Sequence, residues 1–284
     1  MNLPQLSENN GNNNTSDNDF KNCYSICSPG GTGKTFIYNT LYNLLTGKKK
    51  IVCCMAFTGI AATLLPLGKT IHKTFNFTVP IYSDSTSGFN LQSKEADYLR
   101  KVDVFILDEA PMAPRYALEA VDASLRNFMK NDLPFGGKVM ILGGDFRQLL
   151  PVEKDSTESE IIDLCIKKSS LWKHFEIFNL QTNMRVLQSE REFLEFLLRV
   201  GKGELTDNQN NINLSHFPSQ FIAPENSNIV QDIYADAIVN KNYDDFVNLA
   251  ILSPRNEDVN EINDKILNLL EETTEKIFTS IDSV

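Results

Sequence analysis

The sequence predicts an α/β protein built on a parallel β-sheet that is covered by helices on both faces. Several short runs are apolar throughout, such as IVCCMA (51–56) and GKVMILGGD (137–145), and stretches with helical spacing separate them. Strands that are apolar on both faces and alternate with helices are typical of a buried parallel sheet. The chain has 284 residues, 42% of them hydrophobic, which is enough for one or two domains.

The first part of the chain contains a polar tail, a strand, a helix and a second strand. Residues 1–20 are rich in Asn and Ser and offer few apolar side chains, so we expect a disordered tail. YSICS (24–28) predicts a buried strand, KTFIYNTLYNLL (34–45) predicts a helix, and residues 51–56 predict the next strand. The expected apolar face of this helix consists of Phe36, Ile37, Leu41, Leu44 and Leu45.

Two further strands and a long helix follow. VDVFILDEA (102–110) and residues 137–145 are continuous apolar runs that end in acidic residues, and FEIFNL (175–180) predicts another strand. Between the first two lies RYALEAVDASLRNFM (115–129), which predicts a helix. Its expected buried face consists of Tyr116, Ala120, Val121, Leu125 and Phe128.

The last hundred residues predict a connection and the beginning of another α/β domain. Residues 189–201 predict a helix, and residues 203–228 are polar and contain prolines, which is typical of a linker. NLAILSP (248–254) predicts a strand, EDVNEINDKILNLL (257–270) a helix and KIFTSIDSV (276–284) a strand. We therefore expect one domain at 21–187, a connecting helix and linker at 188–228, and an incomplete second domain at 229–284.

Composition restricts the class of protein. No run of about 18 apolar residues is present, and the polar N-terminus lacks the apolar segment of a secretory signal. The spacing of the five cysteines, which include the adjacent Cys53 and Cys54, fits neither a disulfide framework nor a metal site, so we expect buried reduced thiols and an intracellular protein. The net charge of −10 disfavours a uniformly basic nucleic-acid surface but is compatible with a locally basic groove.

A glycine-rich segment between the first strand and the first helix predicts a phosphate-binding loop. SPGGTGKT (28–35) matches G-x-x-x-x-G-K-[ST] except that Ser28 replaces the first glycine, a change that is costly only if φ is positive there. Lys34 is expected to reach the β and γ phosphates and Thr35 to hold Mg²⁺. The residues expected to surround the nucleotide phosphates are Pro29, Gly30, Gly31, Thr32, Gly33, Lys34 and Thr35. The alternative is a glycine-rich turn without a ligand.

Three later motifs supply groups that ATP hydrolysis needs. Asp108 and Glu109 end a buried strand, where one carboxylate can bind Mg²⁺ and the other can activate the attacking water. Gln148, with Asp145 in GGDFRQLLPV (143–152), is predicted to contact the γ phosphate, the alternative being an ordinary β–α turn. Arg185 in TNMRV (182–186) can stabilise charge in the transition state, whereas the alternative is a surface arginine.

A fourth motif, AFTGIAATLLPLGKTIHKTF (56–75), combines hydroxyls, a glycine, cations and rings. This mixture suits a single strand of nucleic acid that is held by its phosphates and stacked on aromatic rings. The candidate contacts are Thr58, Gly59, Thr70 and His72. The alternatives are that Phe75 belongs to the core and that His72 is a buried, hydrogen-bonded histidine.

Taken in order over residues 21–284, these motifs closely resemble the PIF (petite integration frequency) family of DNA helicases, which are RecD-like enzymes of superfamily one and include proteins of Helitron elements. The resemblance implies a P-loop NTPase with two RecA-like domains that uses ATP and Mg²⁺ to move five-prime to three-prime along single-stranded DNA. The resemblance also assigns roles to residues. It implies that the phosphate loop is formed by Gly30 to Thr35, that the phosphates are surrounded by Asp108, Glu109, Gln148 and Arg185, and that DNA is contacted by Thr58, Gly59, Thr70 and His72. Telomere maintenance, recombination, repair and a nuclear location are implied by the resemblance alone.

The sequence departs from the family pattern at three places. Ser28 is the first. The second is the segment before the loop. Asn2 and Gln5 match the family's Asn-x-x-Gln motif, whose glutamine reads adenine, but the stretch that connects them to the loop is Asn-rich and has little helical pattern. The third is that the chain stops inside the second RecA-like domain, so we expect a helicase fragment without the C-terminal motifs. The alternative function is a nucleotide-dependent DNA-binding module without productive unwinding, and a small-molecule kinase is disfavoured because it does not explain residues 143–152.

Overall fold

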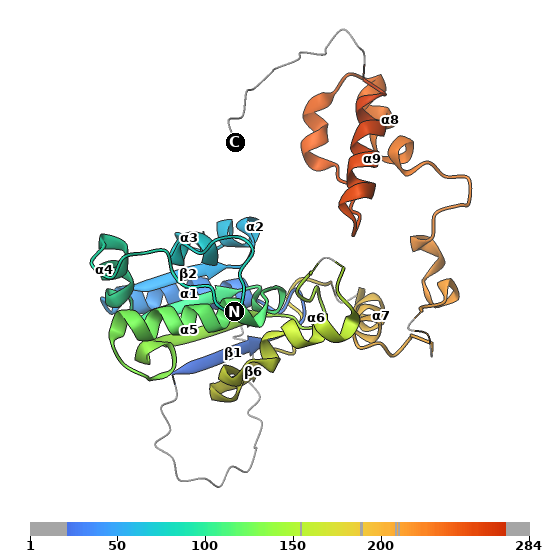
Figure 1. The fold of residues 1–284 in the computed structure, drawn as a ribbon. Coiled ribbons are helices and arrows are strands. Elements are labelled where there is room, and N and C mark those ends of the chain that lie inside the picture. The colour runs from blue at the N-terminus through green and yellow to red at the C-terminus, as the bar shows by residue number, and fades with distance from the viewer. Residues whose placement is uncertain (1–21, 154, 188–189, 208, 210, 271–284) are drawn as a thin grey trace. The chain divides into compact units, whose positions relative to one another are not determined.

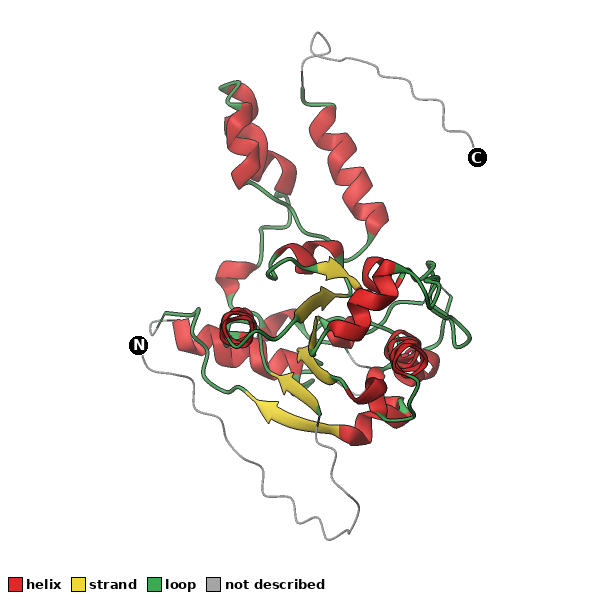
Figure 2. Ribbon diagram, turned by 90° about the vertical axis from the view of Figure 1, so that its left-hand side faces the viewer, coloured by secondary structure: helices red, strands yellow, loops and turns green. Residues whose placement is uncertain are grey.

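The computed structural model describes residues 22–153, 155–187, 190–207, 209 and 211–270 (Figures 1 and 2). The chain divides into two compact units, residues 1–206 and 207–284. Among the described residues, no helix is both long enough and apolar enough to cross a membrane.

The described part of the first unit contains a six-stranded parallel sheet with the strand order β3-β2-β4-β5-β1-β6. The strands are β1 Cys23–Cys27, β2 Val52–Ala56, β3 Lys69–Thr70, β4 Val104–Asp108, β5 Val139–Gly144 and β6 Phe175–Asn179. All predicted strands of this unit are confirmed, whereas β3 is only two residues long and gives no periodic signal. Because every pairing is parallel, the carboxyl ends of the strands lie at one edge, which is where α/β sheets bind ligands.

Helices cover both faces of this sheet, as Figure 2 shows. The helices of the described part of this unit are α1 Lys34–Gly47, α2 Gly59–Thr63, α3 Ile71–Phe75, α4 Lys94–Lys101, α5 Arg115–Met129, α6 Glu158–Leu164 and α7 Arg191–Gly201, and α1 to α5 supply the helices that cover the sheet. The predicted helices α1, α5 and α7 are confirmed, and α2, α3, α4 and α6 were not predicted. The sequence signal for α6 was its capping box, in which Thr157 and Glu160 bond reciprocally at the N-terminus.

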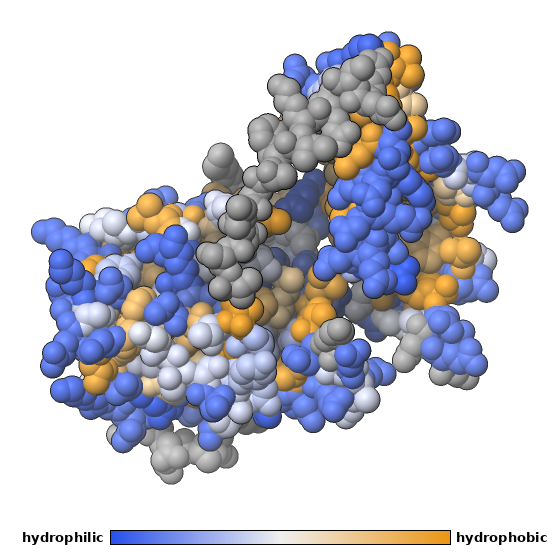
Figure 3. All heavy atoms as spheres, turned by 45° about the horizontal axis from the view of Figure 1, so that its top comes forward, coloured by the Kyte–Doolittle hydropathy of each residue, from blue (hydrophilic) through white to orange (hydrophobic). Residues whose placement is uncertain are grey.

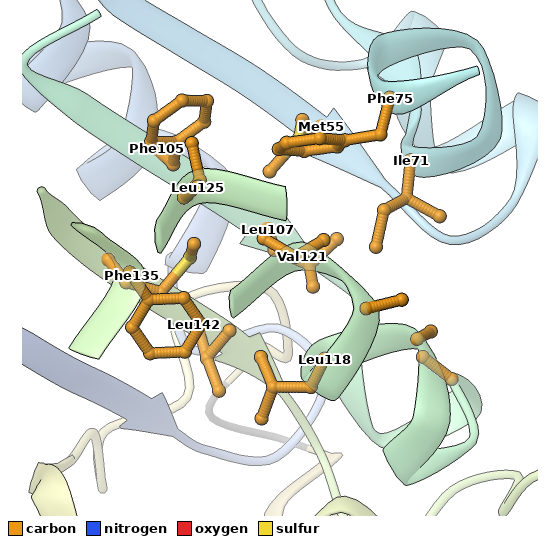
Figure 4. Close-up of a cluster of buried hydrophobic side chains, with 14 of the residues drawn as sticks. Met55, Ile71, Phe75, Phe105, Leu107, Leu118, Val121, Leu125, Phe135 and Leu142 are labelled. Atoms are coloured by element: carbon orange, nitrogen blue, oxygen red, sulfur yellow. The ribbon is translucent and has the colours of Figure 1, made fainter. Parts of the chain in front are cut away.

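The core consists of two clusters, one on each face of the sheet. On one face, alternate strand residues pack against α3, α4 and α5, and Figure 4 shows part of this cluster. Its labelled members are Met55, Ile71, Phe75, Phe105, Leu107, Leu118, Val121, Leu125, Phe135 and Leu142. On the other face Cys54, Ile106 and Ile141 pack against α1 and α2. This alternation confirms that the central strands β2, β4 and β5 are buried on both sides, whereas β3 and β6 at the edges are partly exposed.

The buried face of α1 differs from the prediction. Phe36 and Leu44 were expected in the core but are 58% and 59% exposed, whereas Tyr38 is fully buried. The residues of α1 that pack against the core are Ile37, Tyr38, Leu41, Tyr42 and Leu45. Ile37, Leu41 and Leu45 were therefore predicted correctly.

The second unit contains α8 Ile229–Val239 and α9 Asn256–Leu267, with short 3₁₀ turns at Leu214–His216, Ser219–Phe221 and Tyr243–Asn248. The helix predicted at 257–270 is confirmed by α9, and α8 was not predicted. The strand predicted at 248–254 is wrong: the segment is irregular, and no strand within the described residues of this unit could pair with it. The predicted tail at 1–20 and the predicted strand at 276–284 lie outside the described residues.

Candidate active site

The loop between β1 and α1 lies at the carboxyl edge of the sheet. The Ser28 N–H donates a hydrogen bond to the Gly144 carbonyl oxygen (3.2 Å), and the Thr32 hydroxyl donates to the Pro29 carbonyl oxygen (2.9 Å). Gly31 and Gly33 have φ values of +80° and +92°, which favour glycine. The loop leads into the N-terminus of α1 at Lys34, and unpaired N–H groups at such an end attract phosphate.

Ser28 fits the backbone of this loop. It is not among the residues with positive φ, so the one condition that would make a serine costly here is not met. Its side chain is buried, and its hydroxyl has no hydrogen-bond partner among the described residues. Its carbonyl oxygen instead accepts a hydrogen bond from Lys34 Nζ (3.1 Å), which also donates to Pro29 O (3.3 Å).

Asp108 and Glu109 lie where β4 ends, at the same edge of the sheet. Burial raises the pKa of Asp108, while the Glu109 N–H and the charge of Lys34 oppose that shift. Burial also raises the pKa of Glu109, the Asp108 carboxylate raises it further, and Lys34 again lowers it. Lys34 therefore lowers the pKa of both carboxyl groups, and the parallel pairing of β1, β5 and β4 places the phosphate loop and the acidic pair at the same edge of the sheet.

Tyr38 is a further residue of this region that sequence reasoning missed. It lies one helical turn after Lys34 and is fully buried. Burial raises its pKa well above the usual value, and the nearby Asp108 carboxylate raises it further. Its hydroxyl occupies the space beside Gly143, since a Cβ built at Gly143 would lie only 1.4 Å from it. The signal in the sequence was the helical spacing from Lys34 to Tyr38.

The residues at this edge fit a magnesium ion that binds together with phosphates. Asp108 Oδ1 is buried and has no hydrogen-bond partner among the described residues, so a cation could satisfy it. Thr35 follows Lys34 in the first turn of α1. No group of three or more His, Cys, Asp or Glu side chains within the described segments could hold a metal. One carboxylate and one hydroxyl, completed by phosphate oxygens and waters, are the usual protein share of a Mg²⁺ site.

The segment after β5 carries Asp145, Arg147 and Gln148. Arg147, which the sequence analysis did not single out, bonds the buried Asp145 carboxylate through both Nε (2.9 Å) and its backbone N–H (3.1 Å). Gln148 lies over the phosphate loop, because a Cβ built at Gly30 would be 3.6 Å from its Nε2. Gly30, Asp145, Arg147, Gln148 and Arg185 line one cavity of about 360 Å³.

Arg185 reaches the same cavity from the loop after β6. A Cβ built at Gly31 would lie 3.0 Å from Arg185 Cβ, so the first side-chain atom of Arg185 packs directly against the phosphate loop. Asn183, which sequence reasoning missed, lies between them and donates to the Gly30 carbonyl oxygen (3.0 Å). The structure thus brings Gln148 and Arg185 to the phosphate loop, and their roles remain predictions.

The candidate DNA contacts lie after the carboxyl end of β2, and two of them stabilise the local backbone. The Thr58 hydroxyl caps α2 by accepting from Ala61 N–H (3.3 Å), and the Thr70 hydroxyl caps α3 by accepting from Lys73 N–H (3.2 Å). These roles explain the threonines structurally and leave each hydroxyl proton free to donate. Gly59 is exposed at the first position of α2.

His72 and Phe75, from the same motif, differ in environment. Phe75 is fully buried in the core, which confirms the structural alternative for it. His72 is half-buried with its ring centroid 5.6 Å from that of Phe57, and burial lowers its pKa. Ile60, Leu64 and Leu67 of the same motif expose apolar side chains. Figure 3 shows that hydrophobic residues are scattered among hydrophilic ones on the face that it draws. Gln5, the predicted adenine contact, lies outside the described residues.

Comparison with known proteins gives consistent matches. The family model described as PIF1-like helicase matches residues 13–211. The ATP-dependent DNA helicase Pif1 of Psychrobacter sp. is 32% identical over 247 residues, which cover 86% of this chain and 34% of that protein. The ATP-dependent DNA helicase RRM3 of Saccharomyces cerevisiae is 31% identical over 181 residues, which cover 62% of this chain and 24% of that protein.

A solved structure agrees with these matches. The crystal structure of Pif1 helicase from Bacteroides in complex with ADP-AlF3 and single-stranded DNA superposes with a TM-score of 0.56 at 28% identity. That match covers 66% of this chain and 44% of the crystallised chain. The alignments with the two curated relatives thus span only about a quarter to a third of the length of those proteins.

Proposed function

This chain belongs to the PIF1-like helicase family, and from that membership we propose that it binds and hydrolyses ATP to drive movement along single-stranded DNA. The observation that carries the proposal is the meeting of four predicted motifs at one edge of the sheet. Lys34 acts electrostatically on Asp108 and Glu109, while Gln148 and Arg185 lie against Gly30 and Gly31. A translocation direction of five-prime to three-prime is proposed from the resemblance.

Each side chain has a proposed part in hydrolysis. Lys34 leaves the carbonyl oxygens of Ser28 and Pro29 and binds the β and γ phosphates, which are stronger acceptors because they are charged. Asp108 and Thr35 hold Mg²⁺, which supplies positive charge at the phosphates. Glu109 orients the attacking water and accepts its proton, a role that its raised pKa favours because a stronger base takes up the proton more readily. Gln148 contacts the γ phosphate.

The proposed partner is single-stranded DNA, and the proposed contacts are Thr58, Gly59, Thr70 and His72. The hydroxyl protons of the two threonines can donate to phosphates, and Gly59 has no side chain to obstruct the backbone of the strand. His72 contacts the strand through its neutral ring, because burial lowers its pKa and thereby disfavours the charged form. Lys69 and Lys73 flank this segment and supply local positive charge to a chain of net charge −10.

The domain division and the cellular setting are also proposals. We propose that residues 21–187 form the first ATPase domain, that 188–228 connect the domains, and that 229–284 begin a second RecA-like domain. The compact unit that starts at Asp207 and contains α8 and α9 supports a separate second part. A nuclear location and a role in telomere maintenance, recombination or repair are proposed from family membership, and a fluorescent fusion would test the location.

Glu109→Gln tests the proposed hydrolysis. The substitution preserves the size of the side chain and removes its ability to accept a proton, so we expect DNA-stimulated turnover to fall at least about 100-fold while ATP binding is retained. ATP hydrolysis is measured with and without single-stranded DNA, and binding with a fluorescent ATP analogue. The matched control is Glu176→Gln on the exposed side of β6, which should leave turnover unchanged.

The outcomes separate the proposed enzyme from the alternative. Nucleotide and DNA binding without turnover in the parent chain would instead identify a nucleotide-dependent DNA-binding module. Full turnover in Glu109→Gln would contradict the role of Glu109 as the base. Strand displacement from a five-prime-tailed duplex then tests whether hydrolysis is coupled to unwinding.

A further inference from the structure

The loop after β6 is joined to the phosphate loop by hydrogen bonds across more than 150 residues of sequence. Asn183 Nδ2 donates to the Gly30 carbonyl oxygen (3.0 Å), and the Met184 N–H donates to the Gly31 carbonyl oxygen (2.8 Å). These bonds bind two successive carbonyl groups of the phosphate loop to two successive residues of the second loop. The two loops are therefore connected directly through their backbones and one side chain.

The other end of the Asn183 amide organises the backbone that carries the arginine. Its Oδ1 accepts from the Arg185 N–H (2.8 Å) and from the Val186 N–H (3.0 Å). An asparagine that accepts from the N–H groups two and three residues ahead folds the backbone into a fixed turn. One side chain thus determines both the position of this loop and its internal shape.

Close packing adds to these bonds. A Cβ built at Gly31 would lie 2.8 Å from Asn183 Nδ2, 3.0 Å from Asn183 Oδ1 and 3.0 Å from Arg185 Cβ. The amide and the arginine backbone therefore use the space that the missing side chain of Gly31 leaves. Gly31 also has φ +80°, so two separate constraints favour glycine here.

We infer that Asn183 is a positioning residue that fixes Arg185 relative to the phosphate loop. The inference rests on the proposed function, because it gives Asn183 an effect on hydrolysis through the predicted role of Arg185. The backbone N–H and Cβ of Arg185 are held at the phosphate loop, while the residue as a whole is exposed. An arginine whose backbone is already fixed loses less freedom when its side chain engages transition-state charge, and small displacements of such groups cost large rate factors. Asn183 contacts neither the water nor the phosphates in this scheme.

The chemistry of the amide explains why asparagine suits this position. The site needs one donor towards Gly30 and one acceptor towards two N–H groups, and an amide supplies both. An aspartate would keep the acceptor, lose the donor and place a negative charge beside the binding site for phosphates. An alanine would lose both. Asn183→Asp should therefore impair the site at least as much as Asn183→Ala.

A double-mutant cycle with Arg185→Ala tests the inference. We expect Asn183→Ala to lower kcat of DNA-stimulated hydrolysis by about 10- to 100-fold and to leave the affinity for a fluorescent ATP analogue within about threefold. The double variant should be no slower than Arg185→Ala alone, because a positioning residue has no effect once its target is removed. The matched control is Asn131→Ala, which removes an amide that bridges Leu133 N–H and Gly136 O far from the nucleotide.

The outcomes distinguish this inference from the proposed function. If the two rate losses multiply in the double variant, or if Asn183→Ala weakens nucleotide binding as much as it lowers kcat, Asn183 does not act through Arg185 and the inference is wrong. If Arg185→Ala is as active as the parent while Glu109→Gln is inactive, the enzyme proposal stands and the role of Arg185 fails.

A second measurement does not depend on turnover. Hydrogen exchange of the Arg185 and Val186 N–H groups should be faster in Asn183→Ala than in the parent chain and unchanged in Asn131→Ala, because these two N–H groups lose their acceptor. Unchanged protection of these two groups in Asn183→Ala would overturn the inference even if the parent chain hydrolyses no ATP.

Discussion

Gly143→Ala is expected to destabilise the first unit, because the missing side chain of Gly143 makes room for Tyr38. A Cβ at position 143 would lie 1.4 Å from the Tyr38 hydroxyl oxygen and 2.6 Å from its Cζ atom. These separations are far below van der Waals contact. Tyr38 is fully buried between α1 and the sheet, so its ring has no free space into which it could rotate.

The size of the effect follows from the two ways in which the structure can respond. If the backbone of β5 moves away, the cost resembles that of an overpacked core, roughly 1–3 kcal/mol. If the Tyr38 ring leaves its site, the cost approaches the roughly 3–5 kcal/mol of losing a buried aromatic side chain. We therefore expect a loss of about 1–5 kcal/mol, which is a large part of the roughly 5–15 kcal/mol that stabilises a typical domain.

The assay is urea unfolding followed by tryptophan fluorescence. Trp172 is the single tryptophan of the sequence and lies in the first unit, so its signal reports on the part of the chain that contains Gly143. The matched control is Gly47→Ala at the end of α1, where an added Cβ meets nothing within 4 Å. That variant should stay within about 1 kcal/mol of the parent and could be more stable, because alanine favours helix.

The collision itself is tested in a Tyr38→Leu background. Leucine lacks the ring atoms that would meet the new methyl group, so Gly143→Ala should cost about 1 kcal/mol or less there, and the two changes should couple strongly. A penalty that is equally large in both backgrounds would refute the reasoning. So would a Gly143→Ala variant within about 0.5 kcal/mol of the parent in the original background.

Two further predictions concern buried ionisable groups. Burial raises the pKa of Asp108 above its usual 3.8. Between the usual pKa and the raised pKa the folded chain binds more protons than the unfolded chain, so the folded chain loses stability as the pH rises through this range. Asp108→Asn should therefore be more stable than the parent at pH 7 and equally stable below the usual pKa, and a pH-independent difference in urea midpoint would contradict this. Burial raises the pKa of Cys53 to about 11 and of Cys54 to about 12. All five cysteines are free and only Cys27 is not buried, so a thiol reagent should modify at most one per folded chain and five in urea.

The sheet could be predicted from the sequence because its strands are buried on both faces. The apolar run of β2 ends at Ala56, where the strand ends, and the apolar runs of β4 and β5 lead directly into Asp108 and Asp145. Helix α5 was predicted to the residue, since its buried side chains recur at helical spacing. The short helices α2 and α3 have only five residues, too few for a periodic pattern, and their caps at Thr58 and Thr70 were interpreted only as DNA contacts.

The sequence could not predict the contacts that join distant segments. Asn183 donates a hydrogen bond to the Gly30 carbonyl oxygen although 153 residues of sequence separate them, and no local pattern marks an asparagine as part of a phosphate loop. Arg147 pairs with Asp145 inside a motif that was expected to contact phosphate, and only the fold shows which side chain takes that carboxylate. The wrong strand at 248–254 has a related cause, because an apolar run becomes a strand only where another strand can pair with it.

The strand order explains why GGDFRQLLPV begins with two glycines, Gly143 and Gly144, which the motif alone did not explain. Strand β5 lies between β1, which leads into the phosphate loop, and β4, which ends in Asp108, so groups from these neighbours must approach its end. Tyr38 fills the space beside Gly143, and Pro111, just after the acidic pair, fills the space beside Gly144, whose added Cβ would be 2.2 Å from it. Successive strand residues point to opposite faces, so each glycine admits one neighbour on its own face. The glycines therefore leave room for the packing of Tyr38 from α1 and of Pro111 next to the acidic pair against the end of β5.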